Sequence, residues 1–515
     1  MSDGLHTLGR WTRDRALATP DRVAVDDRGV TLRYRDLHAR ATALATALRA
    51  AGYGVGDRVA TVTGNSADQV VLLFACAQAG LVLAPLSWRL SPGELAEQLE
   101  IADPAVVLVE QEFTTLADAA LERLPLPPRR TALGRSGIEA HVPPPTRRPG
   151  ADVPGVQGPV RDDDPLLLVF TSGTGGSPKG ALLTHANCFW TNLSLSRTVE
   201  LTSRDVVLSV LPQFHAGGWN IQPLLAWWTG ATVVLERTFE PERVLQLVAE
   251  RGVTTMMGVP TNYLILAEHP AFEHTDLSSL RLAVVGGAPM PEPLLRTWHR
   301  RGVALTQGYG LTEAGPNVLC LPDDVAQSRS GSAGTPYPHV EVAVADPVTG
   351  QLLDDPGAVS GELLVRGPGV FAGYFRDPAA TAAALVGGWL RTGDLVERDA
   401  DGYYRVIDRL KDVFIVGGEN VSPAEVEAAL ARHPGVAEVA VVGRPDDRWG
   451  EVGAAFVVRR RGVPVDAVEL EEHCRRELAH FKVPRSFTFV PSLPRTSLQK
   501  VSRTALARTP PLESR

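Results

Sequence analysis

The residues with the clearest chemical potential lie at positions 171–180, where the sequence is TSGTGGSPKG. The segment combines four glycines with several hydroxyl side chains and one lysine, Lys179. Glycine lets backbone N–H groups approach an oxyanion closely, and hydroxyls and an ammonium add further hydrogen-bond donors. A short apolar run at 166–170 precedes the segment, so we expect a loop that follows a buried strand. This composition predicts a loop that holds phosphate groups.

Two common phosphate-binding loops do not fit this segment. A Walker loop requires Gly-Lys followed by Ser or Thr, whereas Pro178 precedes Lys179 and Gly180 follows it. The dinucleotide-binding motif fails because Pro178 stands where its third glycine belongs. We therefore expect a nucleotide loop of another type.

Lysine is rare in this chain, which draws attention to the few positions where it occurs. Only four of the 51 basic residues are lysines, at positions 179, 411, 482 and 500. A compact ammonium cannot always be replaced by a guanidinium, so a surviving lysine indicates a site where the ammonium is needed. We treat Lys179, Lys411 and Lys500 as candidate functional residues and expect Lys482 to be structural or at the surface.

The elements that must position these residues alternate between strands and helices. Two apolar runs around Asp27-Arg28-Gly29 predict a hairpin at 23–34, and the following segments predict a helix at 37–51, a strand at 57–63, a helix at 69–79 and a strand at 81–85. The alternation resumes with strands expected at 206–211, 224–228, 231–235, 254–259 and 282–286 and a helix at 241–251. This pattern predicts parallel sheets covered by helices.

The remaining segments differ in composition. Proline, arginine and glycine are concentrated at 124–164, which predicts an exposed, irregular connection. Residues 341–365 are rich in strands and turns, and after Arg409 we expect an α+β unit with helices at 423–432 and 468–478 and strands at 436–443 and 454–458. The predicted fold is α/β with a large N-terminal domain, residues 1–409, that includes a small β subdomain at about 335–405. A smaller α+β C-terminal domain, residues 410–515, follows it.

Bulk properties exclude several classes of protein. A chain of 515 residues is long enough for about two to four domains, and its net charge of −8 gives no indication of nucleic-acid binding. The four cysteines form neither a CxxC pair nor a metal-binding spacing. The most apolar window, 70–86, is interrupted by Gln78 and Gly80 and predicts a buried helix that leads into a strand. With no secretory signal visible, we expect a reduced, cytoplasmic protein without a membrane span.

Five further motifs follow the phosphate loop. They are PQFHAGG from 212, QGYGLTE from 307, RTGD from 391, DRLKDVFIVGGENVSPAEVE from 408 and PRTSLQKVSR from 494. In this order and at these separations they resemble the adenylate-forming superfamily of acyl- and aryl-CoA ligases, luciferases and peptide-synthetase adenylation domains. The resemblance covers essentially the whole chain and is strongest to bacterial acyl-CoA ligases.

This resemblance implies an ATP-dependent reaction in two steps. A small-molecule carboxylic acid attacks the α-phosphate of ATP, which forms an acyl-adenylate and pyrophosphate, and the thiol of coenzyme A then displaces AMP. Mg²⁺, loop N–H groups and lysines would lower the repulsion between the two anions of the first step. The implied cofactors are ATP, Mg²⁺ and coenzyme A.

The resemblance also implies a nucleotide site in the first domain. Phosphate contacts would come from Thr171, Ser172, Gly173, Thr174, Gly175, Gly176 and Lys179, although the family usually has a hydroxyl residue where Gly175 stands. The nucleotide would be lined by Gln307, Gly308, Tyr309, Gly310, Leu311 and Thr312. Within this set Tyr309 would stack on adenine and Thr312 would meet the α-phosphate, while Glu313 would hold Mg²⁺. The adenine would be covered by Gly286, Gly287 and Ala288, just beyond the carboxyl end of a predicted strand.

Three further assignments concern the sugar and the hinge. Asp394 resembles the aspartate that accepts hydrogen bonds from the ribose hydroxyls, and Arg409 resembles the arginine near the same sugar. Lys411 occupies the family's hinge position, where backbone torsions change so that the C-terminal domain presents a different face to the active site.

The C-terminal domain would supply two groups that alternate at the site. Lys500 resembles the lysine whose ammonium bridges the carboxylate and the α-phosphate during adenylation, although Gln499 stands where the family has glycine. In the second step a loop of Gly417, Gly418 and Glu419 would face coenzyme A. The candidate catalytic residues are therefore Lys500, Glu313, Thr312, His215 and Lys179.

His215 bears on the choice of substrate. Peptide-synthetase domains that select an α-amino acid have an aspartate at this position, because the substrate ammonium needs a carboxylate. Histidine resembles the acyl- and aryl-CoA ligases. Trp219 would provide a large apolar wall, and small walls would come from Gly217, Gly218, Gly286, Gly287 and Gly308. We therefore expect a medium- or long-chain, aryl or other bulky apolar acid.

Two alternatives share these motifs. The first is a free-standing adenylating enzyme that loads the phosphopantetheine of an acyl carrier protein, because that arm ends in the same thiol as coenzyme A. The second is a non-catalytic nucleotide sensor on the same fold, which Gly175 and Gln499 favour, whereas Lys179, Glu313, Asp394 and Lys500 argue against it.

Overall fold

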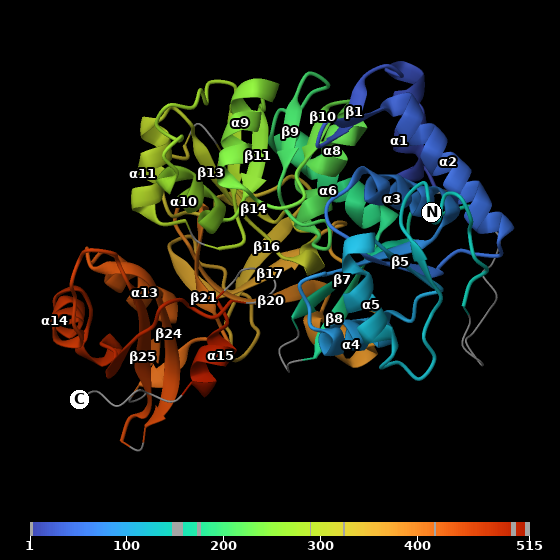
Figure 1. Cartoon of the computed structure of the whole chain (residues 1–515). Coiled ribbons are helices and arrows are strands. Elements are labelled where there is room, and N and C mark those ends of the chain that lie inside the picture. The colour runs from blue at the N-terminus through green and yellow to red at the C-terminus, as the bar shows by residue number, and fades with distance from the viewer. Residues whose placement is uncertain are drawn as a thin grey trace. The chain divides into compact units, whose positions relative to one another are not determined.

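The computed structural model describes residues 4–146, 158–172, 177–288, 290–322, 325–416, 419–446, 448–495 and 501–509. The chain forms two compact units. The first comprises Met1–Val342 and Val365–Arg391, and the second comprises Ala343–Leu364 and Thr392–Arg515. The helices and strands carry the labels of Figure 1.

The first unit contains a nine-stranded sheet of order β15-β14-β13-β12-β11-β9-β10-β1-β2. Strands β13 to β1 along this order pair in parallel, and antiparallel strands complete both edges. The strands are β1 (Val23–Asp27), β2 (Val30–Arg33), β9 (Val206–Ser209), β10 (Thr232–Leu235), β11 (Thr255–Gly258), β12 (Leu282–Val285), β13 (Leu305–Tyr309), β14 (Leu319–Cys320) and β15 (Thr335–Pro336). The predicted hairpin at 23–34 and the predicted strands at 206–211, 231–235, 254–259 and 282–286 are confirmed.

Three helices cover one face of this sheet, as Figure 1 shows: α9 (Pro241–Arg251), α10 (Pro260–Glu268) and α11 (Glu292–Arg300). α9 has the predicted bounds because Pro241 suits the first turn and Gly252, with φ of 59°, ends the helix in the left-handed region. The helices pack on the alternate strand residues Met256, Ala283 and Val285 in a large apolar core. Because side chains alternate along a strand, their neighbours Met257, Leu282 and Val284 belong to a separate, smaller apolar cluster.

A second sheet of seven strands has the order β18-β8-β7-β4-β3-β5-β6. Its strands are β3 (Arg58–Val62), β4 (Val82–Leu86), β5 (Val106–Val109), β6 (Arg130–Ala132), β7 (Pro165–Ser172), β8 (Pro178–Thr184) and β18 (Gly373–Tyr374). β7, β4, β3, β5 and β6 run parallel, whereas β7, β8 and β18 pair antiparallel. On one face, α4 (Pro92–Ala102) and α5 (Thr114–Leu121) bury their apolar residues.

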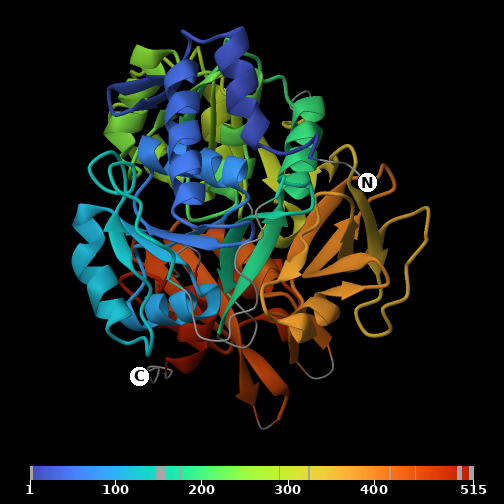
Figure 2. The same cartoon turned by 90° about the vertical axis from the view of Figure 1, so that its right-hand side faces the viewer.

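Helix α3 (Ala67–Ala79) contacts β4 of one sheet and β1 of the other, and almost all of its residues are buried. It packs with α1 (Gly9–Ala18) and α2 (Tyr34–Ala50), which are the blue helices of Figure 2. Its N-terminus is capped by the Ser66 hydroxyl, which accepts a bond of 3.2 Å from Gln69 N–H, and it ends at the left-handed Gly80. The apolar window at 70–86 is therefore a buried helix followed by a strand, as predicted.

The strand predicted at 224–228 is wrong. These residues lie in α8 (Pro223–Thr229), which begins with a proline in the first turn and ends at Gly230, whose φ is 92°. The whole helix is nearly enclosed, so its sequence LLAWW is apolar on all sides and shows no helical period. A short buried helix and a buried strand cannot be distinguished by apolar content alone.

The irregular connection predicted at 124–164 is also partly wrong. Residues 130–132 form β6, which pairs in parallel with β5 at the edge of the seven-stranded sheet. Leu124 and Ile138 are buried, so this segment contributes to the interior rather than only to the surface. Residues 147–157 lie outside the described part of the chain.

A small sheet has the order β16-β17-β20-β19, with β21 paired to β20. Its strands are β16 (Glu341–Ala345), β17 (Val359–Arg366), β19 (Leu385–Val386), β20 (Trp389–Arg398) and β21 (Tyr404–Arg409). The strand-rich character predicted for 341–365 is confirmed by β16 and β17.

The first unit also contains α6 (His185–Thr198), α7 (Gly217–Asn220) and α12 (Pro378–Ala384).

The remainder of the second unit is α+β, as predicted. A sheet of order β23-β22-β25-β24, with β26 paired to β25, carries apolar clusters on both faces. Its elements are β22 (Phe414–Val416), β23 (Glu419–Val421), α13 (Pro423–Ala431), β24 (Val436–Asp446), β25 (Gly450–Arg459), α14 (Ala467–Glu477), β26 (Ser486–Phe489) and α15 (Arg503–Arg508). The large α/β part and the smaller α+β part together confirm the predicted fold class.

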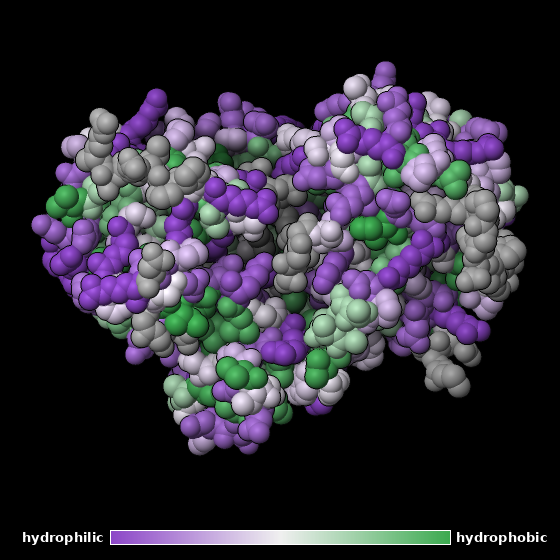
Figure 3. Space-filling model, turned by 90° about the horizontal axis from the view of Figure 1, so that it is seen from below, coloured by the Kyte–Doolittle hydropathy of each residue, from purple (hydrophilic) through white to green (hydrophobic). Residues whose placement is uncertain are grey.

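All four cysteines are buried and none forms a disulfide. In the described part of the chain, no helix combines the length and the apolar character that crossing a membrane requires. Hydrophilic and hydrophobic residues are interspersed over the face drawn in Figure 3.

Candidate functional site

The phosphate-loop motif lies between two antiparallel strands. β7 ends at Ser172 and β8 begins at Pro178, and in their register Thr171 lies opposite Lys179. The hairpin therefore places a hydroxyl and an ammonium at the same end of the sheet. Gly173, Thr174, Gly175 and Gly176 lie outside the described residues.

Glu313 lies beside this hairpin although it is 142 residues from Thr171. It belongs to a short 3₁₀ turn, Thr312–Ala314, that follows β13. The Thr171 hydroxyl donates to Glu313 Oε1 at 3.3 Å, and the Tyr374 hydroxyl donates to the same oxygen at 2.9 Å. Two sequence-predicted residues are thus brought together, and a third residue joins them.

Tyr374 is the residue that sequence reasoning missed. Its ring lies under the Lys179 ammonium, with Nζ 5.2 Å from the ring centroid, a distance typical of a cation–π contact. Burial, and then the nearby Glu313 carboxylate, raise the pKa of Tyr374 above its usual value, so the phenol is a hydrogen-bond donor near neutral pH. A tyrosine after a glycine in AGYF carries no recognisable chemical motif, and only the pairing of β18 with β8 brings it to the site.

The QGYGLTE motif begins inside a strand rather than in a turn. Gln307, Gly308 and Tyr309 belong to β13, and Gly308 and Tyr309 pair antiparallel with Cys320 and Leu319 of β14. The chain then leaves the strand at Gly310, where a Cβ atom would lie 1.4 Å from Pro316 O, so only glycine fits. Leu311 and Thr312 are half-buried and lead directly to Glu313.

The segment predicted to cover adenine lies beyond the carboxyl end of β12. Gly286 is buried, Gly287 has φ of 81°, and Gly287 and Ala288 are exposed. β12 and β13 are parallel neighbours, so both nucleotide segments lie at the same edge of the nine-stranded sheet.

His215 lies in a turn before α7, where its N–H donates to Pro212 O at 3.1 Å and its ring packs against that of Phe214 with centroids 4.4 Å apart.

Two of the expected wall residues behave differently from the prediction. Trp219 is completely buried, and its indole N–H donates to Gln213 O at 2.6 Å, so it packs in the interior instead of facing an open space. A Cβ atom on Gly218 would lie 2.3 Å from Pro212 O, so this glycine permits backbone packing instead of widening a pocket.

Other expected wall residues border the smaller apolar cluster. A Cβ atom on Gly217 would lie 3.3 Å from Ile221 Cδ1, and one on Gly286 would lie 2.8 Å from Met257 Cε. The cluster consists of Met257, Leu282 and Val284, with Val199, Leu211 and Ile221 packed against it and only partly buried. Met257, Leu211 and Ile221 were not predicted, because apolar residues give no motif.

The second unit brings Asp394 and Arg409 together. They are opposite one another in the β20–β21 pair, and Arg409 Nε lies 2.8 Å from Asp394 Oδ1. The Asp394 side chain is only 3% exposed, whereas Arg409 is 47% exposed. The carboxylate is therefore neutralised within the protein while the guanidinium still reaches solvent.

The other predicted residues of this unit are less constrained. Lys411 is exposed in the turn after β21, in which Asp412 N–H donates to Arg409 O at 2.9 Å. Glu419 is exposed at the start of β23, whereas Gly417, Gly418 and Lys500 lie outside the described residues. Lys482 forms an ion pair of 2.7 Å with Glu425.

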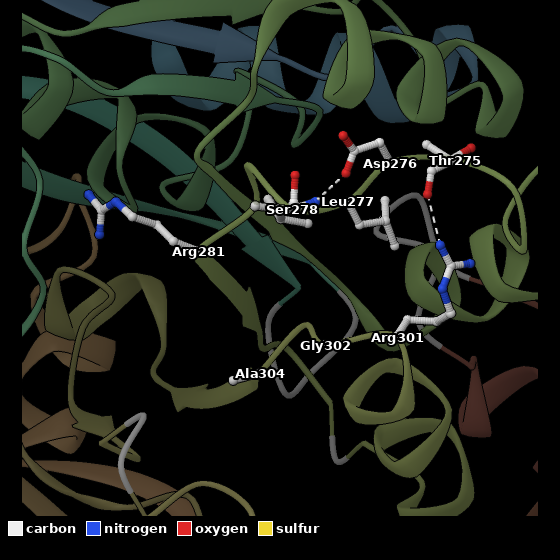
Figure 4. Close-up of a pocket in the computed structure, with 9 residues that line it drawn as sticks. Thr275, Asp276, Leu277, Ser278, Arg281, Arg301, Gly302 and Ala304 are labelled. Atoms are coloured by element: carbon white, nitrogen blue, oxygen red, sulfur yellow. Dashed lines mark hydrogen bonds between the residues drawn. The ribbon is translucent and has the colours of Figure 1, made fainter.

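A hollow of about 450 Å³ lies elsewhere in the first unit, at the amino ends of β12 and β13 (Figure 4). Its two arginines already have partners, since Arg301 donates to Thr275 O at 2.8 Å and Arg281 pairs with Asp205 at 2.7 Å. It lies at the sheet edge opposite to Glu313 and contains none of the predicted residues.

Comparison with known proteins identifies relatives over the full length. The model of a family described as AMP-binding enzyme matches residues 12–375, and that of the AMP-binding enzyme C-terminal domain matches residues 425–500. A feruloyl-CoA synthase from Amycolatopsis sp is 41% identical and the alignment covers 97% of this chain and 98% of that protein. A fatty acid–acyl-carrier-protein ligase from Streptomyces coeruleorubidus is 37% identical, with 98% and 96% covered. The solved structure of an O-succinylbenzoate coenzyme A synthetase from Bacillus subtilis, in complex with ATP and magnesium ion, has 31% identity and a TM-score of 0.85, with 96% of this chain and 99% of that chain covered.

Proposed function

The chain belongs to the AMP-binding enzyme family and is an AMP-forming acid–thiol ligase, and from this premise we propose that it joins a bulky, apolar carboxylic acid to coenzyme A. In the first step a carboxylate oxygen bonds to the α-phosphorus of ATP, and the bond from that phosphorus to the bridging oxygen breaks to release pyrophosphate. In the second step the thiol sulfur bonds to the acyl carbon. The bond from that carbon to the AMP oxygen breaks, and the thiol proton is lost to solvent.

The apolar cluster of the nine-stranded sheet is the observation that supports an apolar acid. Leu211, Ile221 and Met257 present only hydrocarbon and thioether groups, and Gly217 and Gly286 border them without side chains. An α-amino acid bound against these side chains would bring its ammonium to an apolar surface, which disfavours a charge. An aryl or alkyl tail would gain free energy there by leaving water.

The phosphate groups would meet the end of the β7–β8 hairpin. Lys179 supplies a positive charge and Thr171 a hydroxyl at opposite positions of the register. The contact of Lys179 with the Tyr374 ring leaves its ammonium hydrogens available to anions, because a π face accepts charge without forming an ion pair.

Glu313 is the residue that would hold Mg²⁺. Its carboxylate is a hard oxygen donor, and among the described residues Oε2 accepts no hydrogen bond, whereas Oε1 accepts two. No group of three or more His, Cys, Asp or Glu side chains in the described part of the chain could form a protein metal cage. This fits Mg²⁺, which proteins commonly hold through one or two carboxylates and substrate phosphates. When bound, the ion would offset the negative charge of the phosphates.

Residues of the second unit would bind the ribose of ATP and the substrate carboxylate. Asp394 is oriented by Arg409 and can accept a hydrogen bond from a ribose hydroxyl. Lys500 would hold its ammonium between the attacking carboxylate and the α-phosphate, and Lys411 would be the hinge that exchanges it for the loop containing Glu419.

The principal test is acid-dependent exchange of pyrophosphate into ATP. We expect exchange with aryl and medium- or long-chain acids and little with acetate, dicarboxylates or amino acids. AMP release at a steady rate should also require coenzyme A. Lys500→Ala should lose adenylation but still form thioester from supplied acyl-adenylate, and normal adenylation by that variant would exclude Lys500 as the adenylation lysine.

An acyl carrier protein is the second candidate acceptor, because the 37% identical relative is named a fatty acid–acyl-carrier-protein ligase. Parallel reactions with coenzyme A and with a phosphopantetheinylated carrier domain separate the two. Rapid loading of the carrier with no acyl-CoA product would overturn the coenzyme A assignment. Failure of every fatty, aryl and terpenoid acid to support exchange would instead favour a nucleotide sensor.

A further inference from the structure

We propose that Tyr374 is a positioning residue that orients both Glu313 and Lys179 for the adenylation step. This inference rests on the proposed function, in which Glu313 holds Mg²⁺ and Lys179 meets phosphate. No motif in the sequence marks Tyr374, and it contacts the two candidate groups through different parts of its side chain.

The hydroxyl of Tyr374 acts on Glu313. It donates to Oε1 at 2.9 Å, which is shorter than the 3.3 Å bond from the Thr171 hydroxyl to the same oxygen. Two donors that converge on one oxygen fix the plane of a carboxylate that could otherwise rotate. Because both donors are uncharged, they orient Glu313 without neutralising the charge that a cation would require.

The ring of Tyr374 acts on Lys179. The ammonium lies 5.2 Å from the ring centroid. Lys179 is the second residue of β8, so it lies at the end of that strand nearest the phosphate-loop motif. Lysine has a long, flexible side chain, and an aromatic face limits the positions it can occupy while leaving its three donors free. The Tyr374 side chain therefore positions the Lys179 ammonium for phosphate and the Glu313 carboxylate for the metal.

Tyr374 is itself held on both sides. β18 pairs with β8 so that Tyr374 lies opposite Ala181, and the next residue, Phe375, donates its N–H to Gly180 O at 2.7 Å. Tyr374 N–H donates to the Thr381 hydroxyl of α12 at 2.9 Å. A residue anchored to the phosphate hairpin at its backbone and to Glu313 at its hydroxyl keeps the two groups in one geometry.

The test compares two substitutions that remove different parts of the side chain. Tyr374→Phe keeps the ring but removes the hydroxyl, so the Mg²⁺ concentration for half-maximal pyrophosphate exchange should rise about 10-fold, as for other residues that orient metal ligands. Its calorimetric affinity for ATP in EDTA should stay within about 2-fold of the wild type. Tyr374→Leu also removes the ring, so it should additionally weaken ATP binding in EDTA.

Phe371→Leu is the matched control. Phe371 packs edge-on against Tyr374, with ring centroids 4.9 Å apart, but its side chain offers no hydroxyl to Glu313. It should lower the thermal midpoint while keeping the wild-type Mg²⁺ dependence. A merely structural role for Tyr374 would give all three variants the same pattern.

The proposal is overturned if Tyr374→Phe shows the Mg²⁺ dependence of the wild type, or if it weakens ATP binding equally with and without Mg²⁺. Calorimetry with ATP, with and without Mg²⁺, needs no acid substrate. It therefore tests Tyr374 even if no acid supports exchange, which would count against the proposed function instead. Thioester formation from supplied acyl-adenylate should be unchanged in Tyr374→Phe.

Discussion

Glu313 and Asp394 are both carboxylates expected at the nucleotide, yet their surroundings differ in kind. Glu313, in the first unit, accepts hydrogen bonds from two neutral hydroxyls, those of Thr171 and Tyr374. Asp394, in the second unit, is almost fully buried and paired with the Arg409 guanidinium at 2.8 Å. One carboxylate keeps its negative charge available, and the other is neutralised by a residue of the protein.

This difference indicates which ligand each carboxylate suits. A carboxylate held by hydroxyls can attract a cation, because its orientation is fixed while its charge is not compensated. A carboxylate paired with arginine is a poor cation ligand, but its remaining lone pairs can accept hydrogen bonds from neutral hydroxyl groups. The surroundings therefore support Mg²⁺ at Glu313 and ribose at Asp394.

Removal of the metal should separate the two sites most strongly. We expect EDTA to abolish pyrophosphate exchange and to weaken ATP binding, because Glu313 then has no cation through which to reach the phosphates. Adenosine carries no phosphate and should bind with the same affinity in EDTA. Calorimetric titrations of both ligands would check this, and an equal loss for adenosine would contradict the comparison.

Glu313→Gln should lower the rate of exchange by about 100-fold or more, because metal stabilisation of phosphoryl charge contributes several kcal/mol. Glutamine keeps the size of the side chain and an acceptor oxygen for the two hydroxyls. Preference for ATP over 2′-deoxy-ATP should be unchanged, since Glu313 is not expected to meet the sugar. A large change in that preference would show that the roles of the two carboxylates are not distinct.

Asp394→Asn should raise the KM for ATP by about 10-fold, because a hydrogen bond to a charged acceptor contributes roughly 1.5–3 kcal/mol. The substitution also removes the ion pair with Arg409 while keeping one acceptor oxygen. Steady-state kinetics with ATP and 2′-deoxy-ATP should show a reduced preference for the ribonucleotide and an unaltered Mg²⁺ requirement. A raised Mg²⁺ requirement would instead place Asp394 near the metal.

Asp162 is a buried carboxylate whose partner is an imidazole. It pairs with His6 Nδ1 at 2.8 Å, and the neighbouring His185 accepts a hydrogen bond from Leu8 N–H through Nδ1 at 3.2 Å. Burial lowers the pKa of His185 to about 4, and the Asp162 charge only partly opposes this. The unfolded chain then binds a proton that the folded chain excludes, so stability is lost as pH falls from about 6.5 toward about 4.

His185→Asn should remove this pH dependence, because asparagine keeps an acceptor for Leu8 N–H but does not titrate. Between pH 7 and pH 6 the wild type should lose about 0.7 kcal/mol of stability that the variant does not lose. Thermal midpoints of both proteins across this range would measure the difference. Parallel curves for the two proteins would mean that His185 is not the titrating group.

Features of the fold and the site that depend on residues close together in the sequence could be predicted. α9 has its predicted bounds because proline and glycine mark its ends. The strand expected from the apolar run at 166–170 is β7, but β7 extends to Ser172 and Lys179 lies in β8, so both ends of the expected loop belong to strands. Asp394 and Arg409 were matched to family motifs, and the β20–β21 pair brings them into contact.

Features set by packing could not be predicted. The helix at 223–229 is nearly enclosed, so its residues are apolar on every side and its sequence shows no helical spacing of apolar residues. Gly218 and Trp219 were expected to border the substrate, but close backbone approach and burial explain them better. Tyr374 has its position because β18 pairs with a strand about 190 residues earlier, which no local pattern encodes.

The most direct test of the proposed function follows oxygen from the acid. With a bulky aryl acid labelled with ¹⁸O in both carboxyl positions, mass spectrometry should find one labelled oxygen in AMP, one in the acyl-CoA carbonyl and none in pyrophosphate. This distribution is required if the carboxylate attacks the α-phosphate. Label in inorganic phosphate together with ADP, or unlabelled AMP, would contradict it.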